Sequence, residues 1–107
     1  MDKLFNSEAN SDGSYSAFII PIDGTPFEEI FPSDSMSRLR HFNDLVGGHL
    51  EAVVIDERLL LVINEDGKNF NLPVNFVATA LAMSAKSIPD YDYIAGTAIL
   101  IDRAALG

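Results

Sequence analysis

Cysteine is absent from the 107 residues of this chain. Its absence excludes thiol nucleophiles, disulfides, thiolate–zinc sites and iron–sulfur clusters. A small domain without disulfides is typical of a reducing cytosol. Residues 1–8 contain neither a basic start nor an apolar segment, so we expect no signal peptide. No apolar run approaches the length of a membrane span. We therefore expect a cytoplasmic protein that makes no contact with a membrane.

Basic residues are scarce, because 7 Lys and Arg face 16 Asp and Glu and the net charge is −9 at pH 7. Such a field repels phosphate backbones, which argues against direct binding of nucleic acid. The acidity either serves solubility or attracts a basic partner, in one variant by imitating DNA. Acidic residues that we assign to turns and edges form the candidate partner-binding set: Glu28, Glu29, Asp56, Glu57 and Asp90.

Apolar residues make up 48% of the chain and include 7 Phe, which is enough for one hydrophobic core. Residues 1–14 are rich in Asn, Ser, Asp and Gly, and this composition predicts a disordered tail. We therefore expect a single domain over residues 15–107.

Alternation of apolar residues predicts strands over 16–22, 27–31, 49–55, 59–64 and 93–102, with a brief extended piece over 69–72. Ser33, Asp34 and Ser35 are candidate N-caps of a first helix that ends at Gly47. Asp66-Gly67 predicts a tight turn in which Gly67 has a positive φ. Gly96 predicts a bulge or a close backbone approach.

Asn75 is the expected N-cap of a second helix, whose inward face we assign to Phe76, Val77, Ala80, Leu81 and Ser84. The order is therefore strand, strand, helix, strand, strand, an optional short strand, helix and strand. This order predicts an α+β fold: a mostly antiparallel sheet of four to six strands with two helices on one side.

Groups for catalysis or metal binding are few. His41, Asp44 and His49 could be imagined around a metal, but zinc requires three or four well-supported ligands, so we expect no metal and no cofactor. Neighbouring carboxylates such as those of Glu65 and Asp66 point to opposite faces of an extended chain and make poor acid–base pairs. No glycine-rich loop opens a helix to hold phosphate. We therefore expect a protein that is not an enzyme.

Polar residues interrupt the apolar pattern around the second helix. Asn64, Asn71 and Asn75 either hold loose backbone groups near the turn and the helix start, or line a small-molecule pocket together with Tyr91 or Tyr93.

Four blocks occur in order along the chain: residues 45–51 (LVGGHLE), 62–68 (VINEDGK), 72–75 (LPVN) with Ala78-Thr79, and 94–98 (IAGTA). Over about residues 16 to 101 the chain resembles a family of short proteins of unknown function found in bacteria, phages and mobile elements. His49 departs from the aromatic residue that is usual in this family. The resemblance implies a viral or mobile-element source and a small non-catalytic protein that binds host machinery.

These observations lead to one expected function and one alternative. We expect a non-enzymatic phage or mobile-element domain that binds a protein partner, such as a host defence or regulatory protein. The alternative is a binder of a small ligand, such as a signalling nucleotide, at an oligomer interface. The sequence leaves the oligomeric state open.

Overall fold

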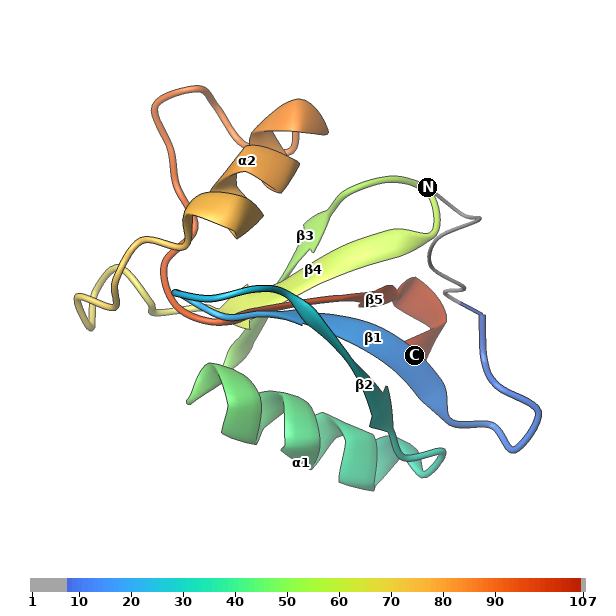
Figure 1. The fold of residues 1–107 in the computed structure, drawn as a ribbon. Coiled ribbons are helices and arrows are strands. Elements are labelled where there is room, and N and C mark those ends of the chain that lie inside the picture. The colour runs from blue at the N-terminus through green and yellow to red at the C-terminus, as the bar shows by residue number, and fades with distance from the viewer. Residues whose placement is uncertain (1–7, 107) are drawn as a thin grey trace.

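Within residues 8–106, which the computed structural model describes, five antiparallel strands form one sheet (Figure 1). Their bounds are β1 (Tyr15–Ile20), β2 (Phe27–Phe31), β3 (Leu50–Val54), β4 (Leu59–Asn64) and β5 (Ala98–Asp102). The strands lie in the order β2-β1-β5-β4-β3, so the last strand occupies the centre. The predicted α+β class is confirmed, as are the two hairpins β1–β2 and β3–β4.

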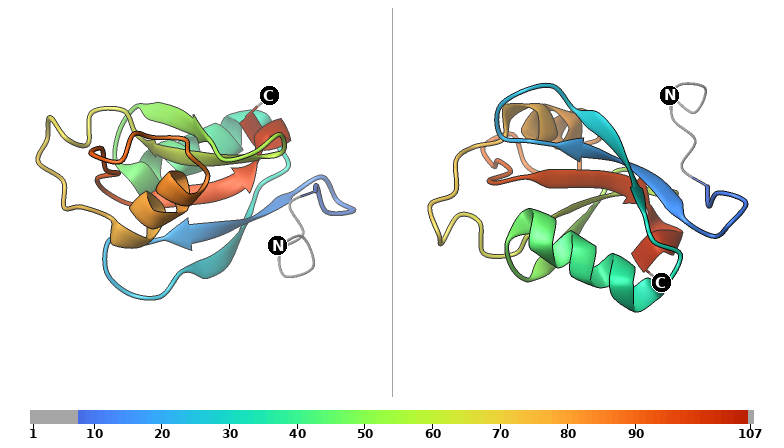
Figure 2. Two further views of the ribbon diagram at one scale, coloured as in Figure 1. Left: turned by 90° about the horizontal axis from the view of Figure 1, so that it is seen from above. Right: turned by 60° about the horizontal axis from the view of Figure 1, so that its bottom comes forward.

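Two α-helices of the described residues cover opposite faces of the sheet (Figures 1 and 2). They are α1 (Ser35–Val46) and α2 (Phe76–Ser84), and a short 3-10 helix, η1 (Arg103–Leu106), follows β5. The prediction that both helices lie on one side is wrong. The physical reason lies in the central strands, which are apolar on both faces and therefore need cover on both.

Two hydrophobic clusters, one on each face, hold these layers together. On the α1 face, Phe42 and Val46 pack against Ile99 of β5. On the α2 face, the fully buried residues of the helix are Ala78 and Ala82, and the partly buried Leu81 packs beside them. The small alanine side chains let α2 lie close to the sheet.

The helix ends follow from local capping. The carboxylate of Asp34, one of the three predicted caps, accepts a hydrogen bond of 2.8 Å from the Ser37 N–H. Gly47 ends α1 with a φ of 80°, as predicted, and donates its N–H to the Asn43 carbonyl. Asn75 caps α2 and accepts from the Ala78 N–H at 3.0 Å, which also confirms the prediction.

Arg38 of α1 is buried, which is rare for a charged side chain without partners. Its guanidinium donates to the carbonyls of Ala105, Pro32 and Ser33 at 2.8–2.9 Å. Because these partners belong to η1 and to the turn before α1, Arg38 joins the chain's C-terminal turn to the first helix.

The structure differs from the predicted elements around α2. Residues 69–72 belong to a series of turns, because Asn71 takes a left-handed conformation with a φ of 57°. The optional sixth strand is therefore absent from the described residues. β5 begins at Ala98, five residues later than predicted, since Gly96 has a φ of 89° and breaks the extended run.

Residues 8–14 make hydrogen bonds of their own before β1. The Asn10 N–H donates to the Ser14 carbonyl at 2.7 Å, and Ala9 bridges Tyr15. Hydrogen-bonded structure thus begins before Tyr15. The remainder of the predicted tail, residues 1–7, lies outside the described residues, as does Gly107.

Candidate functional site: an acidic pocket and the outer face of α2

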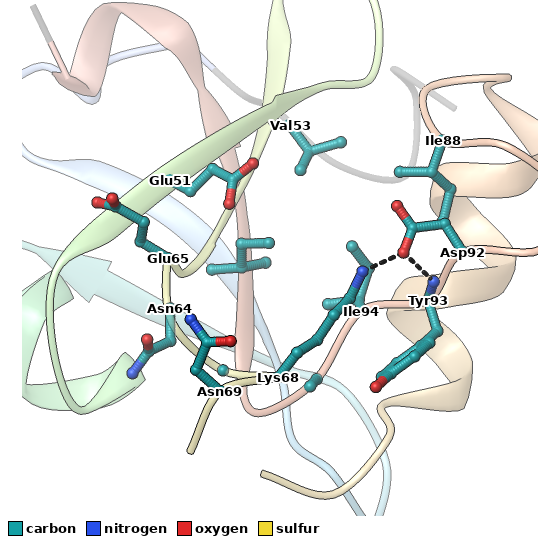
Figure 3. Close-up of a pocket in the computed structure, with 13 residues that line it drawn as sticks. Glu51, Val53, Asn64, Glu65, Lys68, Asn69, Ile88, Asp92, Tyr93 and Ile94 are labelled. Atoms are coloured by element: carbon teal, nitrogen blue, oxygen red, sulfur yellow. Dashed lines mark hydrogen bonds and ion pairs between the residues drawn. The ribbon is translucent and has the colours of Figure 1, made fainter. Parts of the chain in front are cut away.

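A pocket of about 200 Å³ lies between β3, the turns after β4 and the loop after α2 (Figure 3). Its apolar lining comes from Val53, Ile63, Ile88 and Ile94. Its polar lining is the set Glu51, Asn64, Glu65, Lys68, Asn69, Asp92 and Tyr93. The pocket therefore combines an apolar surface with polar and charged residues that outnumber the apolar ones, which is a more polar lining than is usual for a small-molecule site.

The turns after β4 are held in place by two close contacts. Asn64 is buried, donates from its amide nitrogen to the Val46 carbonyl at 3.1 Å and accepts from the Asp66 N–H at 2.7 Å. Gly67 does not have the predicted positive φ. It is instead a point of close approach, because a Cβ there would lie 2.8 Å from the Ala95 carbonyl oxygen. This contact brings the turns and the loop after α2 together around the pocket.

Lys68 forms one wall of the pocket with the loop after α2. Its ammonium group makes an ion pair with Asp92 and lies 4.8 Å from the centroid of the Tyr93 ring. Hydrogen bonding to Asp92 raises the pKa of Lys68, and the same bond lowers the pKa of Asp92. Both groups are therefore charged at neutral pH. A pair this exposed adds little stability, so its main effect is to hold Lys68 at this wall.

Glu51 and Glu65 form the other charged wall, on the β3 side of the pocket (Figure 3). Neither carboxylate makes an ion pair or a side-chain hydrogen bond within residues 8–106. The one cation of the lining, Lys68, is already neutralised by Asp92. The lining consequently carries a net charge of −2 next to an apolar surface, although the Glu51 carboxylate also acts on Lys68 and contributes to its raised pKa.

The structure separates the amides that the sequence grouped as ligand-binding candidates. Asn75 is fully buried, and its amide nitrogen donates to the carbonyls of Ile20 and Gly96, both at 2.9 Å. Asn64 lines the pocket, yet its amide is also occupied by backbone groups. The interpretation in which these two amides hold loose backbone groups is therefore confirmed.

The other members of that set are exposed or only partly involved. Asn71 lies in the turns and outside the pocket lining, and Tyr91 is 88% exposed in the loop after α2. Tyr93 does line the pocket, beneath the ammonium group of Lys68. Sequence reasoning missed Glu51, Lys68 and Asp92 as neighbours, because they come from three separate segments.

The predicted acidic contact set does not form one patch. Glu28 and Glu29 lie on β2 and Asp56 and Glu57 on the β3–β4 turn, at opposite edges of the sheet, while Asp90 lies in the loop after α2. Two members also have structural partners. Glu29 contacts His41 at 2.7 Å, and Asp56 accepts from the N–H groups that follow it in its turn.

The histidines do not gather around a common point. His41 contacts Glu29 and the Phe31 ring, whereas Asp44 and His49 are exposed. Within residues 8–106, no group of three or more His, Asp or Glu side chains is arranged to hold a metal ion. No helix in the same residues is both long enough and apolar enough to cross a membrane.

The outer face of α2, defined here as Phe76, Val77, Ala80 and Ser84, points to solvent. The sequence placed these residues inside together with Leu81. The prediction is wrong for these four residues, whereas the partly buried Leu81 does pack against the core. Phe76 is 76% exposed and Val77 is 47% exposed, although both are large and apolar. The helix is apolar all round, so periodicity could not indicate which side packs on the sheet. The sheet side of the helix holds the alanines and the partly buried Leu81, and Phe76 and Val77 stay outside.

A second apolar recess of about 160 Å³ lies between α1 and η1 and is lined by Met36, Leu39, Phe42 and Leu106. Met36 is 59% exposed there. This end of α1 continues an apolar stripe whose other end, Phe42 and Val46, is in the core. Its orientation is thus the ordinary one for an amphipathic helix, unlike that of α2.

The fold and the site together define a small α+β domain that has an acidic pocket and an exposed apolar face on α2. Residues 16–105 match the family described as "Domain of unknown function (DUF3846)", and the chain belongs to that family. The expected resemblance to a family of unknown function is confirmed to this extent. No curated protein matches the chain. No solved structure matches it either.

Proposed function

We propose that this domain is a non-enzymatic binding module that docks onto a basic protein through the outer face of α2. The observation that carries the proposal is the orientation of this helix, with Ala78 and Ala82 toward the sheet and Phe76 and Val77 toward solvent. A helix that is apolar on every side is normally buried on every side. Exposed clusters of large apolar residues mark interaction sites.

The energetic argument concerns what the exposed side chains gain on binding. Burying a Phe or Val side chain is worth about 1.5–3 kcal/mol, and α2 forgoes this gain when its outer face meets water. Covering Phe76 and Val77 with a partner would recover it without any change in the fold. The alanines inside already satisfy the packing of the domain.

The charge of the chain favours a basic partner over a second copy. Each copy carries −9, so two copies would repel as they approached, whereas a basic protein would be attracted. The acidic residues Glu28, Glu29, Asp56, Glu57 and Asp90 contribute to this field from several sides. Because they are spread over both sheet edges, we assign them to long-range attraction and not to one contact.

The setting of this interaction is part of the same proposal. The ordered blocks of the sequence support a source in phages or mobile elements, and the partner is then a host defence or regulatory protein. The lack of cysteine supports the cytoplasm as the compartment. Neither statement is needed for the docking surface itself.

Affinity capture with matched variants tests the proposal. The purified chain, its Phe76→Ser/Val77→Ser variant and the control Met36→Ser are used as baits in lysate of the source organism. The control removes an apolar side chain on the opposite face of the sheet whose exposure lies between those of Phe76 and Val77. We expect a basic protein to be retained by the wild type and by Met36→Ser, lost by the α2 variant, and released as salt rises.

Two results would overturn this proposal. Equal capture by the α2 variant, or loss only with Met36→Ser, would assign docking to another surface. A dimer in light scattering that dissociates in the α2 variant would make the occupant a second copy.

Charge reversal of Glu28, Glu57 and Asp90 to Lys is expected to slow association without unfolding the domain, since exposed substitutions change stability by about 0.5 kcal/mol or less.

The pocket favours small-ligand binding as a second candidate function. Tyr93 and the buried Asn64 are part of its lining, as that alternative requires. Pockets for drug-sized ligands measure about 300–1,000 Å³, so the 200 Å³ here suits a smaller group than a signalling nucleotide. The free carboxylates of Glu51 and Glu65 would also repel phosphate.

A further inference from the structure

We propose that the pocket between β3 and the loop after α2 receives an arginine or lysine side chain of the protein partner. This inference rests on the proposed function, since it names the chemical group that the partner inserts. It is carried by the pocket's size, its apolar surface and its net negative charge, and it is independent of the outer face of α2.

The charge of the pocket selects a cation. Glu51 and Glu65 line one side without any ion pair among the described residues. Lys68 would be the natural internal counter-ion, but it is paired with Asp92 and lies over the Tyr93 ring. A cation from outside is therefore attracted to this side of the pocket, where an arginine guanidinium would form charge-assisted hydrogen bonds with a carboxylate.

The apolar lining selects a cation with an aliphatic stem. Val53, Ile63, Ile88 and Ile94 border the same space as the glutamates. Arginine and lysine side chains lay their methylene groups on apolar surface while the charged end stays with polar groups. A bare inorganic cation would leave this surface uncovered, and no described group of three carboxylates or histidines is arranged to hold a metal ion.

The probe for this site is N-acetylarginine amide, which presents an arginine side chain as a protein does. Titration into the full chain is followed by the methyl NMR signals of Val53, Ile63 and Ile94. We expect saturable chemical-shift changes with a millimolar dissociation constant, because the compound supplies only one contact of a larger interface. N-acetylcitrulline amide has the same shape without the charge, and we expect its binding to be at least tenfold weaker.

The matched variants are Glu51→Gln/Glu65→Gln and the control Asp23→Asn, an exposed acid on the β1–β2 turn. We expect the pocket variant to weaken N-acetylarginine amide binding at least tenfold and to weaken partner capture, while the control changes neither. An unchanged NMR spectrum outside the pocket shows that the variant is folded.

Three outcomes would overturn the inference. Equal binding of the citrulline compound would remove the role of charge. Binding of adenosine monophosphate in place of the arginine compound would make the pocket a nucleotide site. Tight binding of free 1,4-diaminobutane, with partner capture unaffected by the pocket variant, would assign the pocket to a free amine. All three leave the α2 face unaffected, because only Phe76→Ser/Val77→Ser tests docking there.

Discussion

We expect the loss of the Asn75 side chain to destabilise the domain more than the loss of any other side chain of similar size. Asn75 is fully buried and makes three hydrogen bonds that join different parts of the fold. Its oxygen accepts from the Ala78 N–H at the start of α2, and its nitrogen donates to the carbonyl of Ile20 at the end of β1 and to that of Gly96 before β5. Asn75→Ala removes all three and leaves the backbone groups without this partner.

The magnitude follows from the groups involved. Loss of an N-cap costs about 1 kcal/mol, and each buried carbonyl deprived of its donor adds roughly 1–3 kcal/mol. We therefore expect Asn75→Ala to lower the free energy of unfolding by about 3–7 kcal/mol. For a domain of this size, 3 kcal/mol corresponds to a fall of roughly 12–24 °C in the melting temperature.

Urea unfolding followed by circular dichroism measures this loss, with Asn69→Ala, an exposed asparagine in the turns, as the control. Asn75→Asp keeps an oxygen for the cap but presents no donor to the two carbonyls, so it should be at least as destabilising as Asn75→Ala. A loss below about 1 kcal/mol in Asn75→Ala would refute the assignment of Asn75 as a structural link. A stable Asn75→Asp variant would refute the role of the two donor bonds.

Gly47→Val should lower the free energy of unfolding in urea by about 1–3 kcal/mol, because valine is strained at a φ of 80°. A Cβ at this position would touch nothing within 4 Å, so Gly47→Asn should cost less. Equal stability of the wild type and both variants would contradict this reasoning. Ala82→Leu should lower the free energy of unfolding by roughly 1–3 kcal/mol, because the larger side chain overpacks the space beneath α2. Phe76→Ser should change the free energy of unfolding by about 0.5 kcal/mol or less. The reverse ranking would mean that α2 packs on the sheet in the other orientation. In Lys68→Met, the pKa of the Asp92 carboxyl should rise toward 3.8, its ordinary value, in an NMR titration. Because the pKa of Asp92 is lower in the folded state, its contribution to stability is present above about pH 4 and is lost as the pH drops through the folded pKa. An unchanged Asp92 titration curve in Lys68→Met would show that Lys68 is not its partner.

Much of the fold could be predicted because its signals are local. The two hairpins, the caps Asp34 and Asn75, and the left-handed Gly47 each depend on residues close in sequence. The orientation of α2 could not be predicted, because its apolar residues occur on every side. The length of β5 was overestimated, since the effect of Gly96 depends on contact with the distant Leu72 side chain, which lies 2.9 Å from the position of a Cβ.

The candidate site was predictable only in part. Asn64 and Tyr93 were named from the sequence and do line the pocket, but the charges that decide its chemistry were not grouped together. Glu51 and Lys68 are adjacent only because β3 pairs with β4 and the turns fold back over the loop after α2. Such proximity depends on register and loop packing, which no local pattern indicates.

In-cell photo-crosslinking at Val77 tests the central claim, docking through the outer face of α2, most directly. A photoreactive phenylalanine analogue replaces Val77 in one chain and Met36 in another, so that two exposed positions on opposite faces are compared. The account predicts a discrete adduct with one basic protein from Val77 and none from Met36, and the adduct should disappear when Phe76→Ser is added. Adducts of equal intensity from both positions, or from Met36 alone, would contradict the account.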